Sequence, residues 1–176
     1  SELVRHYGAT ALLCTATQPA LEGLFAQCAP ELAMCEIAPD PDGLFDFFRR
    51  VHFVREGQLA DEAVAARLCE TAQVLCVVNS RKRARTLFGM LPEEGRYHLS
   101  TLMTAEDRER TLETIRKRLK ANESCRVVST SLVEAGVDVD FPTVWREMAG
   151  LDSILQAAGR CNREGKRPLE ESIVHI

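Results

Sequence analysis

Features typical of membrane and secreted proteins are missing from this 176-residue sequence. No apolar run approaches the about 18–20 residues that cross a bilayer, and no basic-then-apolar signal segment opens the chain. The net charge of −4 argues against a protein that binds nucleic acid through a basic tail, although a local basic groove stays possible. Apolar residues make up 45% of the chain, which is enough for a packed core and excludes general disorder.

The cysteines lack the spacing of a metal site or a disulfide framework. Their number is odd, and no two stand in CxxC spacing. Several lie inside apolar segments such as Leu75-Cys76-Val77, where a thiol packs as a small apolar group. We therefore expect buried thiols in a reducing compartment, with no disulfide and no bound metal. The seven are Cys14, Cys28, Cys35, Cys69, Cys76, Cys125 and Cys161.

The parts that hold a nucleoside triphosphate and its metal are also missing from these residues. Gly165-Lys166 resembles the end of a phosphate-binding loop, but five residues separate it from Gly159 instead of four, and Arg167 stands where Ser or Thr would bind magnesium. Asp61-Glu62 resembles a magnesium-binding acidic box, but it opens a predicted helix, where acidic residues favour the helix dipole. Since domains rarely begin on a buried strand such as residues 10–17, we expect a piece of a longer protein.

Strands and helices alternate along the chain. The apolar run at 74–78 is typical of a buried parallel strand, and residues 104–121 form the clearest helix, with Thr104 as N-cap and Asp107 completing a capping box. This alternation predicts an α/β fold with a mostly parallel sheet. Two prolines and a glycine predict a linker at 38–43. The other expected strands are 33–37, 50–55, 97–99, 126–129, 144–148 and 173–176, and the other expected helices 19–27, 61–71, 81–90 and 153–160.

Positive charge gathers in the middle of the chain. Residues 81–120 contain eleven basic and six acidic residues. This pattern fits either a solvated helical face or a face that binds phosphates, and taken alone it favours the solvated face.

A hydroxyl-rich turn follows the predicted strand 126–129. Ser129 and Thr130 stand at the strand end, and Gly136 and Asp138 follow shortly after. Hydroxyls and backbone amides after a strand suit a phosphate oxygen, and a carboxylate after a glycine suits a ribose hydroxyl. The alternative is a simple strand–helix turn in which Ser129 or Thr130 caps the next helix.

Two arginines and an amide recur at helical spacing near the end of the chain. If the helix continues through this segment, Gln156, Arg160 and Arg163 lie on one face. Guanidinium forks suit phosphate oxygens, and Gly159 lets another backbone approach closely. A surface face of salt bridges is the equally good alternative.

Together with two further segments, these motifs resemble superfamily-two helicases, which bind nucleotide between two RecA-like domains. Thr15-Ala16-Thr17 resembles the motif that ends the first domain, and the Asn79 segment resembles the opening of the second. The hydroxyl turn resembles the fifth motif and residues 156–163 the sixth, all in the expected order. The amino-acid sequences of residues 98–103, 134–142 and 150–163 are similar to those of the CRISPR-associated helicase–nuclease of type I systems.

This resemblance implies a RecA-like, mostly parallel sheet flanked by helices on both faces. Residues 1–40 would be the C-terminal tail of the first RecA-like domain, and residues 41–176 most of the second. The parent would use ATP and magnesium to move 3′-to-5′ along single-stranded DNA in the prokaryotic cytoplasm. It would be recruited by the RNA-guided Cascade complex and carry a separate metal-dependent HD nuclease domain. Since this chain lacks the P-loop, acidic box and HD motif, we expect it to hold no cofactor and to be inactive alone.

The resemblance also implies a role for each singled-out residue. Arg160 and Arg163 would supply positive charge to the γ-phosphate, and Gln156, Gly136 and Asp138 would help to hold nucleotide. Thr130, Ser100, Thr101 and Asn79 would contact DNA, and Thr15, Ala16 and Thr17 would couple cleft closure to DNA movement. Two alternatives stay open: another superfamily-two translocase that acts on RNA or chromatin, and a non-enzymatic α/β interaction module.

Overall fold

The computed structural model describes residues 2–12, 23, 26–27, 35, 37–133 and 137–176. The chain divides into two compact units, residues 1–48 and residues 49–176. Most of the predicted elements at 10–17, 19–27 and 33–37 lie outside the described residues, as do Thr15, Ala16, Thr17 and Gly136. The assignment of residues 1–40 to a first RecA-like domain therefore stays a prediction.

The first unit contains the short helices α1 (Glu2–Tyr7) and α3 (Pro41–Phe47). The predicted linker at 38–43 is wrong in its second half, because α3 begins there. The Asp40 carboxylate accepts a hydrogen bond from the Gly43 backbone N–H at 3.0 Å, and Pro41 occupies the first turn, where its missing N–H costs nothing. Turn-forming residues thus start a helix at this point.

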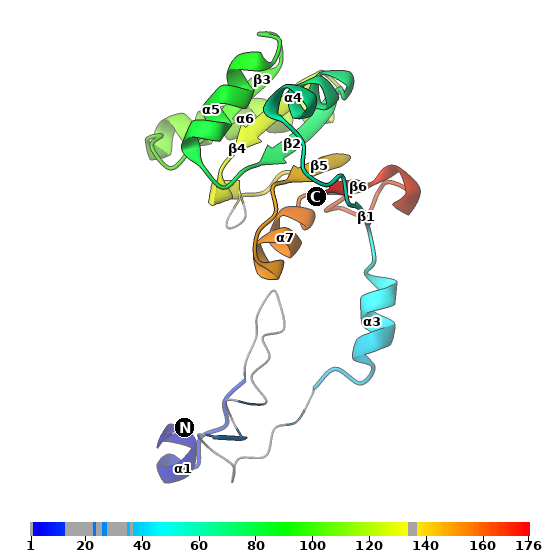
Figure 1. The fold of residues 1–176 in the computed structure, drawn as a ribbon. Helices are drawn as coiled ribbons and strands as arrows, with labels where there is room; N and C mark the ends of the chain where they lie inside the picture. The colour runs from blue at the N-terminus through cyan, green and yellow to red at the C-terminus, as the bar shows by residue number, and fades with distance from the viewer. Residues whose placement is uncertain (1, 13–22, 24–25, 28–34, 36, 134–136) are drawn as a thin grey trace. The chain divides into compact units, whose positions relative to one another are not determined.

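The second unit is built on one six-stranded sheet in which every pairing is parallel (Figure 1). The strand order is β1-β6-β5-β2-β4-β3, which confirms the predicted α/β fold. The strands are β1 (His52–Val54), β2 (Gln73–Val77), β3 (Arg96–Leu99), β4 (Cys125–Ser129), β5 (Thr143–Arg146) and β6 (Ile173–His175).

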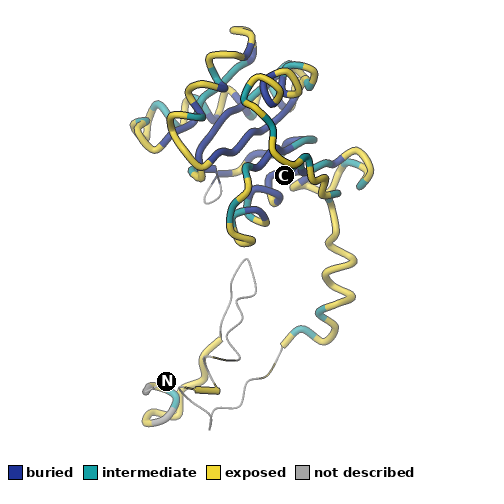
Figure 2. The backbone as a smooth tube through the Cα atoms, in the orientation of Figure 1, coloured by how far each residue is buried: buried dark blue, intermediate teal, exposed yellow. Residues whose placement is uncertain are grey.

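Helices cover both faces of this sheet. Side chains alternate along β2, so Val74 and Cys76 pack with α4 (Asp61–Glu70) and α5 (Arg81–Met90). Leu75 and Val77 belong to the opposite core, with α6 (Ala105–Lys120) and α7 (Leu151–Ala158). All five residues of β2 are buried, and Figure 2 shows the central strands as the buried interior of the unit.

The clearest predicted helix is confirmed as α6. The Thr104 hydroxyl accepts from the Asp107 backbone N–H at 3.1 Å and donates to the Asp107 carboxylate at 2.9 Å. Leu112, Ile115 and Leu119 form its buried stripe. The helix thus follows the sequence pattern at both its start and its inner face.

We predict that Ile115→Ala lowers the free energy of unfolding by about 2–5 kcal/mol, because it removes a fully buried side chain and leaves a cavity. Glu113→Ala, on the exposed face of the same helix, should change it by less than about 0.5 kcal/mol. Denaturant titration followed by circular dichroism measures both. Equal losses in the two variants would contradict this core assignment.

The expectation of buried thiols is confirmed for three cysteines. Cys76, Cys125 and Cys161 are buried, and burial raises the pKa of each thiol to about 12. Cys69 is half-buried and Cys35 exposed, whereas Cys14 and Cys28 lie outside the described residues.

The raised pKa predicts that these three thiols stay protonated, and therefore unreactive, at about pH 8, because the thiolate is the nucleophile. Iodoacetamide should modify Cys35 in the folded protein and spare Cys76, Cys125 and Cys161 until denaturant is added. Peptide mass spectrometry reports each position. Rapid native alkylation of Cys76 would overturn the prediction.

Candidate functional site

Some of the predicted site residues, Asn79, Ser100, Thr101 and Thr130, follow the ends of neighbouring strands. In parallel register, Val77 of β2 lies opposite both Ser129 of β4 and Arg146 of β5, and Leu99 of β3 lies opposite Ser129. The C-terminal ends of these four strands therefore meet at one edge of the sheet. Ligands of open parallel sheets bind at this edge, because loops from several strands converge there.

Hydroxyl residues from β3 and β4 meet at this edge. Ser100 and Thr130 follow the paired residues Leu99 and Ser129, and both are buried, whereas Thr101 is exposed. The Ser129 hydroxyl donates to the Thr130 carbonyl oxygen at 2.8 Å, so it is used within the turn. The short 3₁₀ helix η1 (Ser131–Val133) follows directly. Of the predicted hydroxyl contacts, Thr101 is thus the most open to a ligand.

Helix α7 ends before the two arginines. It runs from Leu151 to Ala158, whereas the predicted bounds were 153–160. The chain then turns back to the sheet, where Phe141 N–H donates to the Arg160 carbonyl and Asn162 N–H donates to the Phe141 carbonyl, both at 2.9 Å. The expected single helical face of Gln156, Arg160 and Arg163 is therefore wrong, because backbone pairing with Phe141 replaces the last helical turn.

Sequence reasoning missed Asn162, which fixes this arginine turn (residues 159–163). Asn162 has a φ of 46°, a left-handed conformation that asparagine tolerates better than most residues. Its buried side-chain amide donates to the carbonyl oxygens of Arg50 (3.1 Å) and Arg167 (2.8 Å) and accepts from the Arg167 backbone N–H (3.0 Å). An asparagine placed between two arginines shortly after a glycine was the available signal for such a turn.

Arg160 is buried within the arginine turn. Its side chain is 8% exposed, and its Nε donates to the Val133 carbonyl oxygen at 2.8 Å. Burial lowers the pKa of the guanidinium, and the positive charge of Arg163 lowers it further, whereas Asp138 raises it. Arginine keeps its proton in proteins regardless, so a charge is held beside η1.

Arg163 is placed differently, at the surface. Its Nε lies 2.9 Å from the Asp138 carboxylate, in a pair whose side chains are 44% and 80% exposed. Its backbone N–H donates to Asp140, which also pairs with Arg167 at 2.8 Å. An exposed pair of this kind contributes about 0–1 kcal/mol, so the Arg163 side chain can leave Asp138 while Asp140 holds its backbone.

The structure therefore brings together Arg160, Arg163 and Asp138, with Gln156 half-buried on the preceding helix. Asn79 follows the C-terminal end of β2, whereas the arginine turn pairs with Phe141, which precedes β5 and so lies toward the other end of the strands. The Asn79 side chain is bonded to Arg146 and to the Met148 carbonyl. Among the described residues, no group of three or more His, Cys, Asp or Glu side chains is arranged to hold a metal ion. No described helix is long and apolar enough to span a bilayer.

The contrast between the two arginines gives a stability test. Arg160→Ala should lower the free energy of unfolding by about 1–3 kcal/mol, because the Val133 carbonyl loses its buried donor. Arg163→Ala should lower it by no more than about 1 kcal/mol, because it removes an exposed pair. Thermal and denaturant melts of this chain measure both losses. A larger loss for Arg163→Ala would contradict the assignment of Arg160 as the arginine that holds the turn in place.

Comparison with known proteins identifies the family. The family described as "CRISPR-associated nuclease/helicase Cas3, C-terminal" matches residues 70–166, more than half of the chain. The Cas3 helicase of Thermoproteus tenax is 28% identical over 94 residues, which are 53% of this chain and 17% of the relative. The Cas3 nuclease/helicase of Methanothermobacter thermautotrophicus is 30% identical over 91 residues, 51% of this chain and 11% of the relative. This chain thus spans less than a fifth of these relatives.

Solved structures show the same fold. T. fusca Cas3 with AMPPNP superposes with a TM-score of 0.55 at 20% identity, over 72% of this chain and 18% of that one. The S. cerevisiae protein Dbp5, bound to RNA and ADP BeF3, gives a TM-score of 0.52 at 18% identity, over 72% of this chain and 35% of that one. With its all-parallel sheet covered on both faces, the chain has a RecA-like fold and belongs to the Cas3 helicase C-terminal family.

Proposed function

We propose that this chain is the second half of an ATP-driven motor that unwinds target DNA for degradation in type I CRISPR interference. The family match supports a helicase parent, and the observation that carries the proposal is the arginine turn, which holds Arg160, Arg163 and Asp138 together beside η1 and the start of β5 in a RecA-like domain. ATP and magnesium would be held mainly by a first RecA-like domain of the parent, because this sequence has no P-loop and no acidic box.

The two arginines would have different roles, one structural and one in binding phosphate. Arg160 is bonded to Val133 and fixes the turn against η1, so its charge stays in place. Arg163 is bound by an exposed pair, so its fork can exchange Asp138 for the oxygens of a γ-phosphate when the domains close. Charge supplied there stabilises the transition state of phosphoryl transfer. Asp138, once released, can accept hydrogen bonds from a ribose, with Gly136 and Gln156 beside the nucleotide.

Nucleic acid would lie along the hydroxyl turns at the sheet edge. The exposed Thr101 would donate to a backbone phosphate, while the buried Ser100 and Thr130 would shape the turns around it. Thr15, Ala16 and Thr17 would link cleft closure to movement along single-stranded DNA. The Cascade complex and a separate HD nuclease domain belong to the same proposal for the parent, and this chain alone would be inactive.

We predict that Arg163→Ala in the full-length parent lowers DNA-stimulated ATP turnover by on the order of 10³-fold or more, because the phosphoryl group loses its arginine. Single-stranded DNA binding should be retained. Arg163→Lys should not restore turnover, since lysine lacks the planar fork. Steady-state ATPase assays with single-stranded DNA, and with RNA of the same sequence, measure the effect and the preferred strand.

Arg110→Ala is the matched control, because it removes an exposed arginine whose pair with Asp107 lies within α6. It should behave as wild type. Near-normal turnover in Arg163→Ala and in Arg160→Ala would reject the proposed role of the turn. Stimulation by RNA and not by DNA would reject the DNA motor and favour a different superfamily-two translocase.

A further inference from the structure

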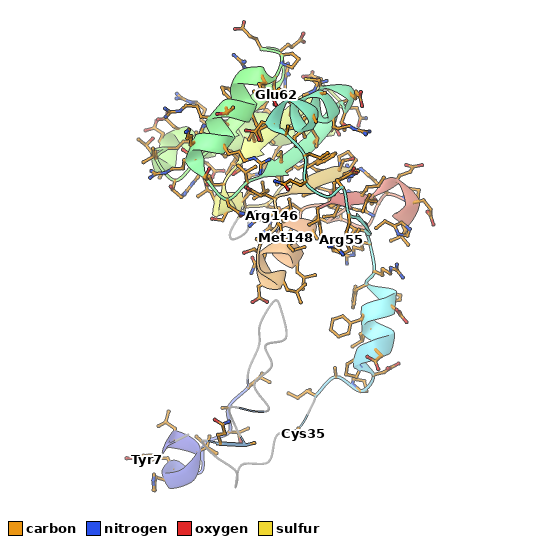
Figure 3. All side chains as sticks on the ribbon, in the orientation of Figure 1. Tyr7, Cys35, Arg55, Glu62, Arg146 and Met148 are labelled. Carbon is orange, nitrogen blue, oxygen red and sulfur yellow. The ribbon has the colours of Figure 1, made fainter. Side chains whose placement is uncertain are left out.

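The side chain of Asn79, in the turn after β2, is already occupied at both ends. Its Oδ1 accepts a hydrogen bond from Arg146 Nη1 at 2.7 Å, and its Nδ2 donates to the Met148 carbonyl oxygen at 2.8 Å. Figure 3 shows Arg146 and Met148 at the end of β5, close to each other. An amide engaged at its oxygen and its nitrogen by the chain itself is poorly placed to read a base or bind a phosphate.

Glu147 holds the backbone of the same turn. One carboxylate oxygen accepts from the Asn79 backbone N–H at 2.6 Å, and the other pairs with Arg83 Nη1 at 2.7 Å. The Nε of Arg83 pairs in turn with Asp61, at the start of α4, at 2.7 Å. The exposed fractions of these three charged side chains lie between 26% and 31%, so their charge-assisted bonds are only partly screened by water.

Packing and polar bonds hold different parts of this turn. Val78 and, on α5, Ala84 and Leu87 are buried in one core, so packing fixes the strand end and the helix. Arg83, Arg146 and Glu147 line a cavity of about 420 Å³ beside them. Asn79 itself is exposed, so its position depends on its hydrogen bonds with Glu147, Arg146 and Met148.

We propose that Asn79 and Glu147 form a clamp that joins the β2–α5 turn to the β5–α7 connection, and that Asn79 is a positioning residue and not a DNA contact. Because α7 leads directly into the arginine turn, the clamp makes the nucleic-acid edge and the nucleotide-binding arginines move together. The coupling role of the clamp rests on the proposed motor function, whereas the hydrogen bonds that form the clamp do not depend on it.

The clamp is tested in the full-length parent with Asn79→Ala, Glu147→Ala and Glu147→Gln. The matched control is Glu109→Ala, which removes a pair with Arg116 on α6 whose side chains are 60% and 33% exposed and which lies outside the clamp. Hydrogen exchange of peptides covering 78–82 and 147–152 is measured first. Asn79→Ala and Glu147→Ala should each speed exchange in both peptides, whereas Glu109→Ala should change neither.

The functional readout is the DNA concentration that half-saturates ATP turnover. Glu147→Ala should raise it by about two- to thirty-fold, as expected for a coupling residue, and leave turnover without DNA unchanged. Glu147→Gln should keep the half-saturating DNA concentration close to the wild-type value, because its amide oxygen still accepts from the Asn79 N–H. Thermal melts of each variant establish that it is folded.

Each result decides the inference. Exchange that changes in only one peptide, or Glu147→Ala that behaves like Glu109→Ala, overturns the clamp. Asn79→Ala that weakens DNA binding without nucleotide, with exchange at 147–152 unchanged, restores Asn79 as a direct contact. If the wild-type parent shows no DNA-stimulated ATPase, the proposed function fails, and the exchange measurement alone still decides whether the clamp exists.

Discussion

Burial of β2 on both sides of the sheet is the constraint on which the other elements depend. A strand with no exposed residue must be covered on both faces, and alternate side chains of β2 belong to two separate cores. Parallel neighbours and crossover helices satisfy this requirement. The same topology directs the ends of β2, β3, β4 and β5 to one edge, so the location of the hydroxyl turns after β3 and β4 follows from how the core is buried.

In the arginine turn, buried polar bonds decide which side chains stay in place and which can move away. Arg160 is held by a buried carbonyl and Asn162 by three bonds to backbone groups. The Arg163 side chain pairs with the exposed carboxylate of Asp138. One arginine is thus held rigidly, while the second can reorient at low cost, which is the combination that the proposed motor function requires.

The clamp lies at the C-terminal end of β5, and polar bonds also fix the side chains there. Arg83, Glu147 and Asn79 connect the starts of α4 and α5 with the end of β5 through directional bonds, beside the cavity that Arg83 and Glu147 line. Directional bonds can be broken and remade in a discrete way, whereas close packing resists such change. A site that changes state during turnover is better joined to its neighbours by such bonds.

The sequence by itself determined the α/β fold, most strands and helices, and the family resemblance, because apolar periodicity and capping residues such as Thr104 act locally. It also placed Asn79, Ser100 and Thr130 directly after strands, as the structure has them. Only the tertiary structure decided the end of α7, where pairing with Phe141 replaced the helical face expected for Arg160 and Arg163. It alone showed that Asn79 is bonded within the chain, because those partners lie more than sixty residues away and no local pattern encodes them.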